Sequence, residues 1–396
     1  MRRFLIGERS FEEESNEFQA ILPRAYEHGL RPHCQCKEPP VPMYIAQLEG
    51  QHFVKRMPLS GRDHDPACPS YAPPYELSGL GPLIGNAIQV DANGRAILKI
   101  DFSMTKKGPR AAASQSADPS ERAIRNEPQK LSLRAMLHYL WEMGELTEWR
   151  SSWAGKRGWG RVRTSLMNAA SQMTTRGGQL SDMLFVPETF RQEDKEAIAA
   201  RRATALAGAQ ASGSGPRKLM IAVAEVKEFI PARVGHRITL RHLPFPLMLE
   251  HEAWKRLNAK YETELELWRS NDELHLVMIA TFGVSASGVA AVAELAMMVV
   301  NENWIPFENV HERHLLERLG ALRRKFVKGL RFNLPQEQPI VSVTLPEERP
   351  SPVAMFIIPA GASGDYQRAL AEMIKARPEM TPWIWCIAEG DMPKLP

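Results

Sequence analysis

Residues 31–75 read RPHCQCKEPPVPMYIAQLEGQHFVKRMPLSGRDHDPACPSYAPPY and hold three of the four cysteines of the chain. Cys34 and Cys36 are separated by one residue, and His64 and Cys68 by three. Closely spaced pairs of cysteine and histidine are typical of metal sites. The two pairs lie far apart in sequence, so a site that uses both depends on the fold of the segment between them.

That intervening segment predicts a β-hairpin. Strands are expected at Tyr44–Leu48 and His52–Met57, with a turn near Glu49-Gly50. A hairpin returns the chain to its start and would therefore bring the two pairs together.

Three thiolates and one imidazole around a tetrahedral ion make a closed structural zinc site, with no open position for a substrate. We therefore predict zinc on Cys34, Cys36, His64 and Cys68, with His33 and His52 as spare nitrogen ligands. One alternative is a set of unpaired thiols, although free cysteines usually lie among apolar residues and these have polar neighbours. The second alternative is a disulfide, which a reducing compartment disfavours. The spacing matches none of the common finger classes.

Length and composition limit the remaining interpretation. A chain of 396 residues has room for two or three domains, and its net charge of +4 is modest. The longest apolar run, Val289–Val300, contains Glu294 and is too short to cross a membrane. The first residues have no apolar region typical of a signal peptide. We expect a cytoplasmic protein that does not associate with membranes.

The chain predicts an α+β fold with three modules. Residues 1–110 form the zinc-binding β-rich module, 131–200 a helical module and 218–396 an α/β domain. Linkers are expected at 111–130 and 201–217, where large apolar residues are scarce.

The helical module has the ingredients of a winged helix. Apolar residues follow helical spacing from Leu133, with Ser132 as N-cap, and again from Trp159. A short strand, Met183–Val186, follows.

The segment 150–181 contains no acidic residue, and it places basic side chains on and before the second helix. A helix with Arg and Asn on its exposed face suits the major groove of DNA. The predicted DNA contacts are Lys156, Arg157, Arg161, Arg163 and Asn168. The alternative is a solvated basic helix. A second basic group at 323–331 could extend a phosphate track.

In the α/β domain, strands and helices are expected in the order that follows. They are strands Leu219–Ile230 and His236–His242, helix 250–268, strand Leu274–Val284, helix 289–300, a helix from Glu312, strands 338–345 and 353–358, helix 364–376 and strand 383–388. The Gly-bearing loop before residue 289 would then resemble, weakly, a phosphate cradle.

The terminal part of this order resembles the core of the PD-(D/E)XK nucleases, which hold magnesium on carboxylates. Glu312 matches the helix acid, but both strand acids are missing, so the centre is expected to be degenerate. An isolated Glu-x-Lys stands at Glu225 and Lys227, and period two would place both on one face of a strand. We expect no catalytic residue, with these three as weak candidates.

Several runs of the chain resemble those of the 1173 family, an uncharacterised bacterial family found on integrative and conjugative elements and plasmids. They are RPHCQC, MYIAQLEG, VKRMPLSG, DPACPSYAPP, ELSGLG, GKRGWGRVR, AEVKEF, FVKGLRFN and the ending MPKLP. The resemblance covers almost the whole chain and implies a mobile-element context without an activity.

Together these features favour a non-enzymatic, zinc-stabilised DNA-binding accessory protein of a bacterial mobile element. Its expected partners are DNA and other proteins of the element. The alternatives are a magnesium-dependent nuclease-like enzyme of the element and a protein-binding scaffold.

Overall fold

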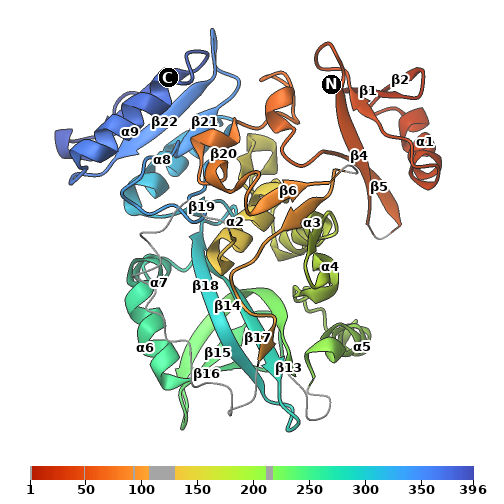
Figure 1. The fold of residues 1–396 in the computed structure, drawn as a ribbon, viewed down its shortest axis with the longest axis vertical. Coiled ribbons are helices and arrows are strands. Elements are labelled where there is room, and N and C mark those ends of the chain that lie inside the picture. The colour runs from red at the N-terminus through yellow and green to blue at the C-terminus, as the bar shows by residue number, and fades with distance from the viewer. Residues whose placement is uncertain (1, 49, 92–93, 107–129, 211–216) are drawn as a thin grey trace.

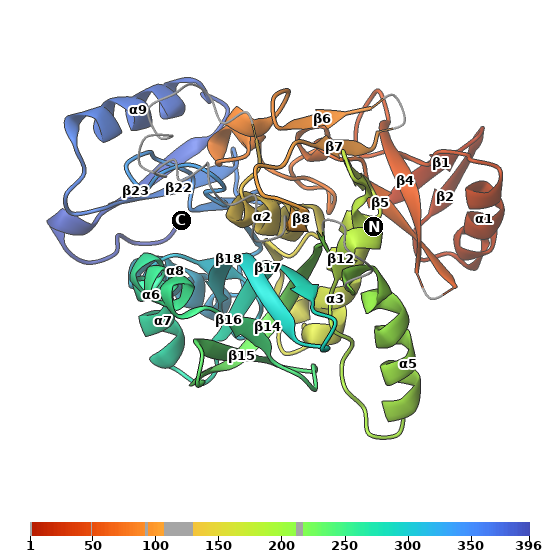
Figure 2. The ribbon, with the colours of Figure 1, turned by 60° about the horizontal axis from the view of Figure 1, so that its bottom comes forward.

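The computed structural model describes residues 2–48, 50–91, 94–106, 130–210 and 217–396. It shows the expected mixed α+β fold. The N-terminal sheet and the C-terminal sheet lie on opposite sides of helix α2 (Leu133–Met143) in both views (Figures 1 and 2). The linker predicted at 111–130 lies outside the described residues except for residue 130. None of the helices in the described ranges combines the length and the apolarity that crossing a membrane requires.

The N-terminal sheet has the strand order β2-β1-β3-β4-β5 and is covered by one helix. Its elements are β1 (Arg3–Ile6), β2 (Arg9–Glu12), α1 (Asn16–Glu27), β3 (His33–Cys34), β4 (Val41–Leu48) and β5 (Gln51–Arg56). The predicted hairpin is confirmed, since Tyr44 pairs with Lys55 and Leu48 with Gln51. Phe4 and Phe18 stack with ring centroids 5.1 Å apart and form the centre of a separate small core.

A second sheet joins this region to the middle of the chain. Its strands are β6 (Ile88–Val90), β7 (Ala96–Leu98), β10 (Met173–Thr175) and β11 (Gly178–Gln179). β7 pairs in parallel with β10, so residues from two predicted modules share this sheet. A further two-stranded pairing joins β8 (Thr105–Lys106) to β13 (Arg217–Lys218).

Both predicted helices of the central segment are present. Ser132 Oγ accepts a hydrogen bond from Ala135 N and caps α2, and α3 spans Trp159–Ala170. The other elements are β9 (Glu148–Trp149), α4 (Leu180–Met183), β12 (Leu184–Phe185) and α5 (Lys195–Leu206). The linker prediction at 201–217 is wrong in its first part, because its alanines and arginines favour a helix, which continues to Leu206.

The central segment does not form a sheet of its own. β9 pairs with β20 (Phe326–Lys328), and β12 pairs in parallel with β14 (Met220–Pro231). These two-residue strands are stable only as parts of larger sheets. The predicted boundaries between 131–200 and 218–396 are therefore crossed by both sheets of the C-terminal half.

The larger of these sheets closes on itself. β14, β15 (His236–Leu240), β16 (Leu247–Leu249), β18 (Ala290–Val300) and β17 (His275–Val284) pair in this order, and β17 returns to β14. β19 (Pro306–Phe307) extends β18, and helices α6 (His251–Lys260) and α7 (Glu262–Arg269) lie beside the sheet (Figure 1). The helix expected at 250–268 is thus divided at Tyr261.

The helix predicted at 289–300 is wrong. Residues Ala290–Val300 form β18, which pairs along its length with β17. Alanine, leucine and methionine favour a helix locally, but here the whole of Ala296–Val300 is buried in the sheet. The loop before it joins two antiparallel strands, so the weak resemblance to a phosphate cradle between strand and helix is removed.

The C-terminal sheet has the strand order β23-β22-β21-β20-β9. Its remaining elements are α8 (Val310–Ala321), β21 (Val343–Leu345), β22 (Val353–Ile358), α9 (Gly364–Lys375) and β23 (Thr381–Cys386). α8 begins two residues before Glu312, and β21 is shorter than the strand expected at 338–345. β22 and β23 are parallel, while β20, β21 and β22 are antiparallel neighbours.

Candidate functional site

The two predicted ligand pairs meet in space. Cys34 lies in β3, which is held between β1 and β4, and Cys36 lies two residues after the end of that strand. His64 and Cys68 lie in the loop after β5, where Cys68 N donates to Asp65 O at 2.8 Å. One ligand atom of each of the four residues lies within 4.8 Å of all the others. The hairpin therefore assembles a group able to hold a metal ion.

The distances within this group fit one tetrahedral ion. Cys34 Sγ lies 3.8 Å from Cys68 Sγ, and His64 Nδ1 lies 3.3 Å from Cys36 Sγ and 3.8 Å from Cys68 Sγ. A tetrahedral centre with ordinary zinc bond lengths places two sulfurs about 3.8 Å apart and sulfur and nitrogen about 3.6 Å apart. A disulfide needs a sulfur separation of about 2.05 Å, and all four cysteines of the chain are free.

The thiols of this group are also electrostatically coupled. The hydrogen bond from Cys34 lowers the pKa of Cys68, and His64 and the backbone N–H of Ser70 act in the same direction. Sharing that proton raises the pKa of Cys34. A thiolate is the form that binds a metal ion. The lowered pKa of Cys68 favours its thiolate.

The spare histidines lie outside the group. His33 lies in β3, and the ring of His52 in β5 lies 5.1 Å from that of Tyr26. Neither is among the four converging residues.

The loop that contains His64 and Cys68 supports one wall of a cleft. Pro69 O accepts from Arg150 Nη2 at 2.8 Å, and Ser70 Oγ accepts from Arg2 Nη1 at 3.0 Å. Arg150, Arg2 and Pro69 all line a cleft of about 220 Å³. The residues next to Cys68 thus fix two guanidinium groups beside this space.

The opposite wall is the polar face of α3. Arg161, Thr164 and Asn168 line the cleft, facing residues of α1 and β5. A second cleft, of about 310 Å³, adjoins it near the start of α3. Glu145, Trp153, Arg161 and Ser165 line both. We refer to the two together as the α3 cleft.

This geometry changes the interpretation of α3 as a helix that enters a DNA groove. A recognition helix must project from the protein surface to reach base edges. Here protein elements stand opposite the same face, at the position that the DNA groove would occupy. Arg161 and Asn168 therefore face a cleft between two parts of the chain.

Two of the five predicted DNA contacts are exposed cations of this cleft. Lys156 and Arg161 are exposed, and neither side chain has an ion pair or a hydrogen bond with another described residue. Arg157 is half-buried and donates to the backbone oxygens of Leu146 at 2.9 Å and Glu148 at 2.7 Å. Burial lowers the pKa of Arg157 to about 10. Arg157 thus stabilises the fold through its hydrogen bonds to these backbone oxygens.

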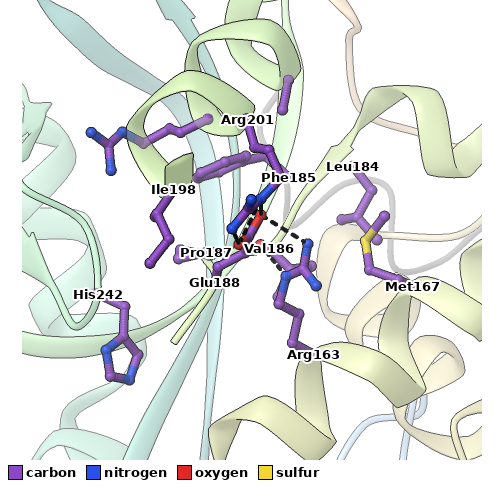
Figure 3. Close-up of a pocket in the computed structure, with 12 residues that line it drawn as sticks. Arg163, Met167, Leu184, Phe185, Val186, Pro187, Glu188, Ile198, Arg201 and His242 are labelled. Carbon is purple, nitrogen blue, oxygen red and sulfur yellow. Dashed lines mark hydrogen bonds and ion pairs between the residues drawn. The ribbon is translucent and has the colours of Figure 1, made fainter. Parts of the chain in front are cut away.

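Arg163 belongs to a different, smaller cavity of about 70 Å³ between α3, β12 and α5 (Figure 3). Its Nε donates to Val186 O at 3.1 Å, and its guanidinium lies 3.7 Å from Glu188. Arg201 binds Glu188 from the other side, and the hydrogen bond from Arg201 lowers the pKa of this carboxylate. Arg163 therefore shares one carboxylate with Arg201 inside the protein.

The second basic group, at 323–331, is largely neutralised. Arg324 pairs with Glu348, Lys325 with Glu347 and Arg331 with Glu308. These acids lie outside the segment, so the segment's sequence alone overstates its charge.

The weak catalytic candidates have separate surroundings. Glu225 is buried, accepts a hydrogen bond from His275 Nδ1 at 2.8 Å and forms an ion pair with Arg241, whose Nε lies 2.8 Å away. Lys227 is exposed and lies at an irregularity of strand pairing between Val226 and Glu228, where the expected alternation of faces is interrupted.

Glu312 is also buried, in an ion pair with Lys328 at 2.8 Å. Among the described residues, no hydrogen bond or ion pair joins Glu225, Lys227 and Glu312 to one another. The sequence prediction missed Lys328 as the partner of Glu312.

The acids of the α3 cleft were missed as well. Glu145 pairs with Lys55, and Glu148 pairs with Arg56 at 2.7 Å with both side chains buried. The sequence held no signal for this pair, because both acids follow the end of α2, Glu145 in a left-handed conformation with φ 58° and Glu148 in β9.

A family model described as "Protein of unknown function (DUF1173)" matches residues 4–388. No curated protein and no solved structure matches the chain.

Proposed function

The chain belongs to the DUF1173 family, and from its geometry we propose that it is a zinc-stabilised DNA-binding accessory protein of a bacterial mobile element, located in the cytoplasm and without catalysis of its own. The single observation that carries DNA binding is the α3 cleft, in which the cations Lys156 and Arg161 are exposed and have no acidic partner among the residues that the structure describes. Free cations in a cleft favour an anionic ligand, and the phosphates of DNA supply that charge.

Zinc is the ion that suits the converging group best. Three soft thiolate ligands and one imidazole favour zinc over magnesium, calcium or manganese. With all four positions taken by protein, the ion would contribute to folding and would not bind a substrate. Cys34, Cys36, His64 and Cys68 would hold it, and its binding would order the loop that contains Pro69 and Ser70.

The mobile-element context is the part of the proposal that rests on resemblance. The runs RPHCQC and DPACPSYAPP, which contain the three cysteines of the candidate metal site, are those that resemble proteins of integrative and conjugative elements most specifically. An accessory role in handling the DNA of such an element is consistent with a cationic cleft.

The test is fluorescence anisotropy on labelled DNA oligonucleotides at two salt concentrations. Replacing Lys156 and Arg161 together with Ala should weaken binding and reduce the slope of affinity against salt by about two, one released counterion for each lost phosphate contact. The matched control is Lys255→Ala with Arg368→Ala, which removes one lysine and one arginine that are exposed on α6 and α9. The control should bind as the wild type does.

The same oligonucleotides should be incubated with magnesium, and we expect no cleavage. No binding at low salt would contradict DNA binding and favour the scaffold. Equal affinity of the cleft variant and the control variant would show that DNA does not bind in the α3 cleft. Cleavage that is lost in Glu225→Ala would instead support the nuclease-like enzyme.

A further inference from the structure

We infer that the DNA bound by this protein is single-stranded, and that the α3 cleft holds an unpaired nucleotide with its base against Phe53 and its phosphates on Arg161 and Lys156. This inference rests on the proposed function and specifies the form of DNA that the site accepts.

The dimensions of the cleft suit one nucleotide better than a duplex. One part measures about 220 Å³ and the other about 310 Å³, whereas pockets that enclose small ligands measure about 300–1,000 Å³. In duplex recognition the protein enters a groove of the DNA, since the bases are stacked and paired inside the helix. Only an unpaired base can leave the stack and enter a protein cleft.

Phe53 supplies an aromatic surface at the cleft. It is one of the large apolar side chains that remain exposed, at 38%, and it lines the part of the cleft formed by β5. A base stacked on an aromatic ring is the usual means by which proteins bind single strands without sequence preference.

Trp153 is not available for the same purpose. The guanidinium groups of Arg150 and Arg157 lie over its ring, 5.1 Å and 5.0 Å from its centroid. Among the aromatic residues that line the cleft, Phe53 is therefore the better platform.

The free cations lie where a strand leaving Phe53 would meet them. Lys55 in the same cleft is neutralised by Glu145, and Arg150 is bound to Pro69 O and lies 3.7 Å from Glu148. Lys156 and Arg161 remain for phosphates, and Arg161 borders both parts of the cleft. A single strand could thus follow the cleft from Phe53 past Arg161 to Lys156.

The experiment compares a labelled single-stranded oligonucleotide with the blunt duplex of the same sequence, using full-length protein with its metal. We expect the single strand to bind more tightly. Phe53→Ala should weaken single-strand binding by about 5- to 100-fold without changing the salt slope, because it removes stacking and no charge. Phe53→Tyr should restore the affinity. Phe190→Ala removes another exposed phenylalanine, 47% exposed, and should have no effect.

The failures are distinguishable. If the duplex binds at least as tightly as the single strand, or if Phe53→Ala binds like the wild type, the inference is overturned while DNA binding stands. If neither form binds at low salt, the proposed function itself fails. Thermal unfolding of each variant verifies folding, and an exposed side chain such as Phe53 should leave the midpoint unchanged within about 1 °C.

Discussion

The pair Lys328–Glu312 offers the sharpest test of whether the C-terminal core is structural. Lys328 is 1% exposed and Glu312 is 4% exposed. Lys328 Nζ donates to Glu312 Oε1 at 2.8 Å and to Gly329 O at 2.7 Å, while Glu308 N donates to Glu312 Oε2 at 2.8 Å. The pair therefore joins α8 to β20 in the interior.

Replacing Lys328 with Met keeps most of the side-chain volume and removes the charge. The Glu312 carboxylate is then left buried without its cation, which typically lowers the free energy of unfolding by about 3–5 kcal/mol. Glu312→Gln leaves the ammonium group in the same position and should cost a similar amount. The double variant has no isolated charge, so it should cost less than the sum of the single ones by about 1–3 kcal/mol.

Urea unfolding followed by tryptophan fluorescence measures these differences, and the chain has nine tryptophans to report them. The control is Lys255→Met, which breaks an exposed pair with Glu252 and should change stability by less than about 0.5 kcal/mol. Single variants that each cost less than about 1 kcal/mol, or costs that simply add in the double variant, would refute the structural role. Glu312 and Lys328 would then be open to a catalytic interpretation.

Two further predictions concern the candidate zinc ligands and the dependence of stability on pH. Cys36→Ser should release most of the bound zinc and unfold the N-terminal region, because metal binding contributes folding energy; zinc below about half an equivalent in the wild type, with all thiols freely titratable, would show that the group binds no metal. Burial raises the pKa of Glu142 to about 7 from its ordinary value of 4.5, so the folded state holds this proton more tightly and stability should fall as pH rises between these values. Glu142→Gln should remove that fall and stabilise the protein at pH 8 by at most about 3 kcal/mol; parallel pH profiles of unfolding for Glu142→Gln and the wild type would contradict it.

The sequence by itself determined the features that depend on neighbours in the chain. The hairpin between Tyr44 and Lys55 follows from alternation and a glycine turn, and it returns the chain toward Cys34. The first helix is capped by Ser132 as predicted, and apolar spacing predicted which face of α3 is buried. Local patterns decide these features, because their contacts are made within one element or between two consecutive ones.

The tertiary structure alone decided the rest. Ala290–Val300 is a strand because β17 lies beside it, and this pairing outweighs the helical preference of its residues. Lys328 and Arg157 resemble surface cations in the sequence, yet other elements of the fold supply Glu312 for Lys328 and backbone carbonyls for Arg157. Lys156 and Arg161 remain free because no such partner reaches them in the described chain. Whether a charge is free or balanced depends on residues of other elements, and the folded chain determines which of those come close.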